Sequence, residues 1–259
     1  MSDQRDERNG SGTPGAVWTN AALIRIRDLT RVYEEGDLKV HALRGVDLDV
    51  ASREFTALAG PSGSGKTTLL NIIGALDHPT EGTVEVDGTD ITEMDKGDAA
   101  DFRLARVGFI FQAYNLVPVL TTLENAEFTL LLRGVAAKER RKRVKPLLER
   151  VGLGDKLDRK PHELSGGQQQ RVAIVRALAT EPKMVLADEP TANLDSETSA
   201  DLLDLMLELN RELGITFLFS SHDPVVIERA RRVVRLKDGR VDRTEGRENG
   251  GTEAKDGAE

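Results

Sequence analysis

A run of nine residues in the first third of the chain has the residue types and spacing of a phosphate-binding loop. It fits the pattern G-x-x-x-x-G-K-[ST] and consists of Gly60, Pro61, Ser62, Gly63, Ser64, Gly65, Lys66, Thr67 and Thr68. The glycines allow consecutive backbone N–H groups to face an anion, Lys66 adds positive charge over the outer phosphates, and Thr67 offers a hydroxyl ligand to Mg²⁺. The alternative is a glycine-rich turn that matches the pattern by accident.

The segments on either side of this loop favour nucleotide binding. Residues 55–59 are apolar enough for a buried strand that runs into the loop, and residues 68–73 are typical of a helix that leaves it. The N-terminus of such a helix faces the bound phosphates, where its dipole stabilises negative charge. We therefore predict a nucleotide site at this turn.

A second polar group follows an apolar strand. Asp188 comes directly after the apolar run 184–187, and Glu189 is next to it. Asp188 would position Mg²⁺, directly or through water, and Glu189 would polarise the attacking water as a general base. A strand that simply ends in a solvated turn is the alternative, and the phosphate-binding loop makes the metal and base site the preferred interpretation.

A third candidate site opens a predicted helix over residues 169–180. Ser165 is a good N-cap, but the two glycines that follow it, Gly166 and Gly167, are a costly way to make only a cap. They are better explained if backbone N–H groups, together with Gln168, approach a second phosphate. One phosphate loop and two phosphate-facing helix starts in one chain indicate a site that another copy completes.

The strand patterns predict the elements that position these residues. Segments 23–29, 46–50 and 83–88 alternate apolar and polar residues, which is typical of half-buried antiparallel strands. Continuously apolar segments predict parallel strands buried on both faces, at residues 55–59, 107–111, 184–187 and 216–220. The expected fold class is α/β, with a P-loop NTPase core of mainly parallel sheet flanked by helices, an antiparallel β layer and a helical subdomain inserted at about 113–165.

Composition limits the classes of protein that fit. The formal net charge of −8 argues against a nucleic-acid partner, and the absence of cysteine excludes disulfides and thiolate chemistry. The sequence contains no run of about 18 apolar residues, so it predicts no membrane span. The N-terminus also lacks the apolar core of a signal peptide, and we therefore expect a cytoplasmic location. Polar, glycine-rich composition predicts flexible tails at 1–21 and 244–259, around a domain at 22–243.

The order of these motifs resembles the nucleotide-binding subunit of ABC transporters. The resemblance covers residues 22–242 and rests on the phosphate loop, Gln112, residues 164–171, residues 188–191, residues 193–195 and residues 221–223. It implies ATP and Mg²⁺ as cofactors, a head-to-tail homodimer, and a separate transmembrane permease that is the chain's only link to the membrane. The chain would lie on the cytoplasmic face of that membrane.

The resemblance also implies roles for individual residues. Tyr33 would stack on adenine, Gln112 would reach the metal and the attacking water, and His222 would contact the γ-phosphate. The residues that would cap the γ-phosphate held by the other protomer are Ser165, Gly166, Gly167 and Gln168, and those at the dimer interface would be Asn193, Leu194 and Asp195. Taken singly, a surface tyrosine, a glutamine that ends a strand and a histidine in a polar turn are ordinary alternatives.

Two longer stretches refine the resemblance. Residues 33–46 and 111–125 are similar to the branch that contains the LolD, MacB and FtsE ATPases. This implies the ATPase engine of a transporter of the lipoprotein-release or macrolide-export type, or alternatively a regulatory ATP-dependent clamp that moves no cargo. The segment after Gln112 would form the groove for the permease's coupling helix, although Tyr114, Leu116, Val117 and Val119 fit a lobe core equally well. The ABC ATPases of DNA repair and translation are disfavoured because this chain has one nucleotide domain and no coiled-coil insertion.

Overall fold

An antiparallel sheet forms the first layer of the molecule. The computed structural model describes residues 22–36 and 38–246. The strand order in this sheet is β2-β1-β4-β5, and every neighbouring pair is antiparallel. Its strands are β1 (Ala22–Glu35), β2 (Leu38–Ala51), β4 (Glu81–Val86) and β5 (Thr89–Asp90). The alternating apolar pattern of the sequence therefore predicted this layer correctly.

A second, mainly parallel sheet has the order β10-β9-β3-β8-β7-β6. Neighbours from β9 to β6 are parallel, and only β10 runs antiparallel to its neighbour β9. Its strands are β3 (Phe55–Ala59), β6 (Val107–Ile110), β7 (Met184–Asp188), β8 (Thr216–Ser221), β9 (Arg232–Lys237) and β10 (Arg240–Gly246). All residues of β3 and β8 are buried, as their continuous apolar runs predicted.

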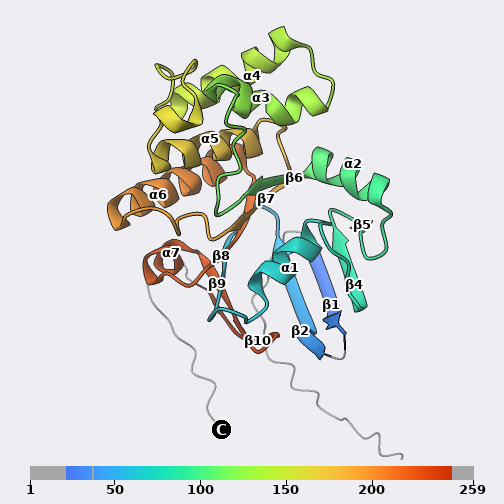
Figure 1. Ribbon diagram of the computed structural model, residues 1–259. Helices are drawn as coiled ribbons and strands as arrows, with labels where there is room; N and C mark the ends of the chain where they lie inside the picture. The colour runs from blue at the N-terminus through green and yellow to red at the C-terminus, as the bar shows by residue number, and fades with distance from the viewer. Residues whose placement is uncertain (1–21, 37, 247–259) are drawn as a thin grey trace, which may run out of the picture.

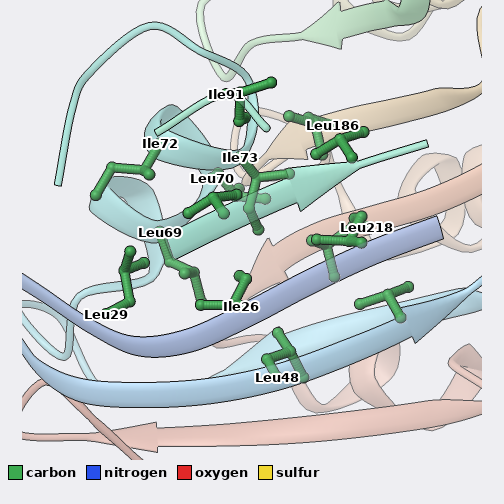
Figure 2. Close-up of a cluster of buried hydrophobic side chains, with 14 of the residues drawn as sticks. Ile26, Leu29, Leu48, Leu69, Leu70, Ile72, Ile73, Ile91, Leu186 and Leu218 are labelled. Atoms are coloured by element: carbon green, nitrogen blue, oxygen red, sulfur yellow. The ribbon is translucent and has the colours of Figure 1, made fainter. Parts of the chain in front are cut away.

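Helices cover both faces of the parallel sheet. Helix α1 (Lys66–Ile73) lies between the two sheets, where its apolar side chains meet Ile26 and Leu48 from one sheet and Leu186 and Leu218 from the other (Figure 2). Helix α2 (Lys96–Arg106) packs at the edge of this core. Helices α5 (Gly166–Leu178), α6 (Ser196–Leu213) and α7 (Pro224–Arg229) supply a second core on the opposite face. Each fully buried leucine stabilises the fold by about 1.5–3 kcal/mol.

A helical lobe stands at one end of the molecule. It contains α3 (Thr122–Leu132), α4 (Ala137–Arg150) and the short 3₁₀ turn η1 (Pro161–Glu163), all within the stretch 113–165. Figure 1 shows α3 and α4 together at this end, with α5 beneath them. The lobe has its own apolar core, to which α5 contributes Val172 and Val175. Because α5 also contributes to the core under the parallel sheet, it belongs to both parts.

The C-terminal strand extends beyond the boundary expected at residue 243. Strand β10 continues through Gly246, because Thr244 and Glu245 pair with Val234 and Val233 of β9. The carboxylate of Glu245 also accepts hydrogen bonds from the guanidinium of Arg235. The rest of both expected tails, 1–21 and 247–259, lies outside the described residues. Within the described part of the chain, no helix has the length and apolar character needed to cross a bilayer.

Candidate functional site

The phosphate-binding loop connects β3 to α1, as predicted. Lys66 is the first residue of α1, and its Nζ donates to the carbonyl oxygens of Gly60 at 2.8 Å and Pro61 at 3.0 Å. Gly65 precedes the helix with φ 101°, a value that side-chain-bearing residues rarely adopt. Ser64 Oγ is buried without a hydrogen-bond partner. A loop that holds a lysine ammonium on two of its carbonyls and buries a hydroxyl without a partner suits an anionic ligand.

The carboxyl end of β7 brings Asp188 to this loop. Asp188 Oδ1 accepts hydrogen bonds from Thr67 Oγ1 at 3.1 Å and from Ser220 Oγ at 2.5 Å. Thr67 and Asp188 are 121 positions apart in the sequence. The parallel pairing of β7 and β8 explains the second contact, since Asp188 and Ser220 are register partners. Thr67 and Asp188 thus form an oxygen pair of the kind that Mg²⁺ prefers.

Glu189, the residue after Asp188, forms a second pair with His222. His222 Nδ1 lies 2.9 Å from Glu189 Oε1, within hydrogen-bond distance. The Glu189 side chain is only 16% exposed, whereas that of His222 is 69% exposed. Glu189 has φ 47°, and its backbone N–H donates to Ser220 Oγ at 3.0 Å. A strained backbone conformation thus accompanies a largely buried carboxylate that contacts an accessible histidine.

Ser165 caps α5, as its residue type predicted. Its hydroxyl accepts from Gln168 N at 3.3 Å, and Gln168 Oε1 accepts from Ser165 N at 3.0 Å, which completes a capping box. The two glycines between them also have a packing role within the chain. A Cβ on Gly166 would lie 2.8 Å from Tyr114 Oη, and a Cβ on Gly167 would lie 2.6 Å from Thr198 Cγ2. Close packing is therefore one reason for glycine at both positions.

The residues expected at a dimer interface follow β7 and lead into α6. Asn193 Nδ2 donates to the backbone oxygen of Gln112 at 2.8 Å, and the Gln112 side chain is exposed. Leu194 packs against the core beneath the parallel sheet. Asp195 is the N-cap of α6: its carboxylate accepts from Thr198 N and Thr198 Oγ1, and these bonds lower the pKa of Asp195. The structure thus gives Asp195 a local role that the motif did not reveal.

Tyr33 lies in a polar cluster on β1. Its hydroxyl donates to Asp77 Oδ2 at 2.7 Å, and the Arg31 guanidinium carbon sits 4.5 Å from the ring centroid. Arg31 also donates twice to the Asp77 carboxylate. Sequence reasoning missed Arg31 and Asp77, which orient the ring, and Ser220, which holds both Asp188 and Glu189. Only Ser220 left a signal, as a polar residue at the end of an apolar strand.

Comparisons with known proteins identify similar sequences over most of the chain. A family model described as ABC transporter matches residues 43–192. An ABC transporter ATP-binding protein of Thermotoga maritima is 47% identical over 225 residues, which is 87% of this chain and 96% of that protein. The macrolide export ATP-binding/permease protein MacB of Syntrophobacter fumaroxidans is 46% identical over 222 residues, 85% of this chain but 31% of its own length.

Solved structures lead to the same group of proteins. The dimeric ATP-binding cassette MJ0796 bound to ADP and Pi matches with a TM-score of 0.79 and 43% identity over 86% of this chain and 98% of that chain. MJ0796 is an ABC transporter ATP-binding protein of Methanocaldococcus jannaschii. The fold class and the resemblance inferred from the motif order are both confirmed by these similarities.

Proposed function

Since the chain belongs to the ABC transporter family as an ATP-hydrolysing cassette, we propose that two copies close head to tail around two ATP–Mg²⁺ and drive a separate membrane permease. The proposal rests on the two contacts made at the end of β7. There Asp188 contacts Thr67 of the phosphate-binding loop, while Glu189 contacts His222. One strand end thereby joins a metal-binding pair to a base and its partner.

Gln112 would reach Mg²⁺, and Thr67 and Asp188 are the two residues that would hold it. Their oxygens lie 3.1 Å apart, and both are hard ligands. Among the described residues, no cluster of three or more His, Asp or Glu side chains forms a metal site by itself, so phosphate oxygens would complete the coordination. When bound, Mg²⁺ would neutralise charge that develops on the phosphates.

The remaining residues would position the reactants. The Lys66 ammonium, now bonded to two loop carbonyls, would turn to the phosphates. The Glu189 carboxylate would orient the attacking water and accept its proton, and His222 would keep that carboxylate and the γ-phosphate in place. Catalysis of phosphoryl transfer depends mostly on such positioning and charge stabilisation. Tyr33 would stack on adenine, with its ring fixed by Arg31 and Asp77.

The helix that begins after Ser165 is the part of the site that a second copy would use. Figure 1 shows α1 and α5 in different parts of the molecule, so the first turn of α5 would meet the phosphates held by another protomer rather than those held by its own loop. Ser165, Gly166, Gly167 and Gln168 would cap the γ-phosphate there, and Asn193 to Asp195 would cross the interface. Contacts to the γ-phosphate that exist only in the closed dimer make ATP hydrolysis a two-state switch. MJ0796, which is similar over most of its length, has been solved as a dimer.

A groove beside Gln112 suits the permease. It has a volume of about 270 Å³ and lies between β6, α3 and α5. Its lining is largely aromatic and aliphatic and includes Phe109, Phe111, Phe128, Leu104 and Leu132. Val119 nearby in sequence is 74% exposed, which disfavours a purely core role for the segment after Gln112. A cytoplasmic helix of the permease would dock here and keep the cassette at the cytoplasmic face of the membrane.

Replacement of Glu189 by glutamine tests the proposal. Glu189→Gln keeps the shape of the side chain but removes the base, so we expect hydrolysis to fall about 10²- to 10⁴-fold while ATP binding persists. The variant should then accumulate as an ATP-dependent dimer, measured by light scattering. Glu208→Gln, at an exposed position of α6, is the matched control and should behave as the wild type. A Glu189→Gln protein that hydrolyses ATP at the wild-type rate, and forms no dimer with any nucleotide, would refute the assignment.

A further inference from the structure

A strained turn follows Gln112. Tyr114 has φ 54° and Asn115 has φ 51°, so two consecutive residues adopt the left-handed backbone conformation. Asparagine tolerates this conformation, but a bulky aromatic residue does so rarely and only where its surroundings enforce it. Contacts from elsewhere in the chain must therefore stabilise this turn.

Arg176 of α5 makes these contacts. Its Nη2 donates to the backbone oxygen of Tyr114 at 2.7 Å, and its Nη1 donates to the backbone oxygen of Asn115. Arg176 is 9% exposed, and burial lowers the pKa of its guanidinium. No ion pair is found for it within the described residues, so the two carbonyls are the partners that compensate its burial.

The turn also touches the first residues of α5. The Tyr114 hydroxyl lies over Gly166, where an added Cβ would approach it to 2.8 Å. The turn thus contacts α5 at its start and again ten residues later, at Arg176, about 15 Å along the helix axis. Because α5 contributes to the cores on both of its sides, it is a rigid support for the turn.

We propose that Arg176 is a positioning residue that fastens the turn after Gln112 to α5, so that Gln112 and the Ser165–Gln168 motif keep one relative position. This inference rests on the proposed ATP-driven dimer, in which both groups must reach the nucleotide. The same helix also holds the loop next to the base, because Gln170 Nε2 donates to the backbone oxygen of Pro190 at 2.6 Å. Asn115 and Arg176 both line the groove proposed for the permease, so a helix docked there would move the turn and α5 together.

Variants of Arg176 and Asn115 test this role in the purified full-length chain. Arg176→Met keeps the length of the side chain but removes both donors. We expect its kcat for ATP hydrolysis to fall about 10- to 100-fold, as for a displaced catalytic element, while the affinity for a fluorescent ATP analogue stays within about threefold of the wild type. Hydrogen exchange at the amides of 113–116 should accelerate, with no change in β3 or α1.

A second substitution separates positioning from general loss of packing. Glycine adopts positive φ without strain and asparagine at a small cost, so Asn115→Gly should relieve part of the strain that the guanidinium otherwise holds and leave only that at Tyr114. In the Arg176→Met background we expect it to restore kcat by about threefold. Arg133→Met is the matched control, because Arg133 also donates to a backbone oxygen, that of Thr180 at 3.1 Å, two residues past the end of α5, and among the described residues no hydrogen bond joins it to the turn. Its kcat should equal that of the wild type.

The possible outcomes are distinct. Should Arg176→Met fold poorly, Arg176→Lys, which keeps the charge and one donor group, carries the same test with a smaller expected loss. With a wild type that is active, the proposal is overturned if Arg176→Met changes the rate of hydrolysis less than about twofold. It is also overturned if kcat and ATP affinity fall equally in Arg176→Met and Asn115→Gly restores neither. If the wild type does not hydrolyse ATP and the Glu189→Gln variant does not dimerise, the proposed function is refuted instead. The exchange measurement needs no nucleotide, so it would still decide whether Arg176 holds the turn.

Discussion

The substitutions Gly65→Ala and Gly63→Ala distinguish two reasons why the phosphate-binding loop requires glycine. Both residues have positive φ, 101° at Gly65 and 78° at Gly63. A Cβ at Gly63 meets nothing within 4 Å, whereas a Cβ at Gly65 would lie 2.7 Å from the backbone oxygen of Ala42 in β2. Gly63→Ala should therefore cost about 1–2 kcal/mol of unfolding free energy, from backbone strain alone. Gly65→Ala adds overpacking of about 1–3 kcal/mol, because a strand carbonyl cannot swing away as a side chain does.

Thermal unfolding of the nucleotide-free protein measures this difference. For a chain of this size, each kcal/mol shifts Tm by about 2–4 °C. We therefore expect Gly65→Ala to melt about 2–12 °C below Gly63→Ala, in the same buffer and at the same scan rate. Nucleotide is omitted because it would stabilise the two variants unequally. Equal melting temperatures would refute the argument that the approach of Ala42, rather than φ alone, requires glycine at position 65.

Two further predictions concern the metal pair and the helical lobe. Thr67→Val removes the hydroxyl that faces Asp188 and should lower Mg²⁺-dependent hydrolysis about 100-fold, whereas Thr67→Ser should stay close to the wild type; a magnesium titration of the ATPase rate distinguishes them. Arg140→Met leaves the buried Glu127 carboxylate, 3.4 Å from the guanidinium, without its ion-pair partner and should cost about 3–5 kcal/mol in denaturant unfolding. Most of that loss should return when Glu127→Leu is added, and an unchanged midpoint for Arg140→Met would contradict the argument.

Local patterns predicted the parts of the site that lie within short segments. The phosphate loop, the Asp188–Glu189 pair and the Ser165 cap are each defined by a few neighbouring residues, so their places at the ends of strands and helices could be predicted from the sequence. The order β9-β3-β8-β7-β6 could not, because pairing between parallel strands depends on contacts between distant segments. Arg176 escaped notice for the same reason: its partner Tyr114 is 62 positions away, and nothing in its own helix marks it. The domain boundary was expected at residue 243, three residues before β10 ends, because the polar residues Thr244 and Glu245 give no apolar alternation.

Helix α5 explains how a site made of distant pieces can respond as one unit. It contributes fully buried residues to both the lobe core and the core beneath the parallel sheet, and all but four of its thirteen residues are buried. A helix packed on both sides is shifted as a body more readily than it is bent, since the interior resists local deformation. Under the proposed mechanism, a push at the groove beside Asn115 would therefore reach Ser165 at the other end of α5. The Gln170 bond to Pro190 would carry the same displacement to the loop that follows Glu189.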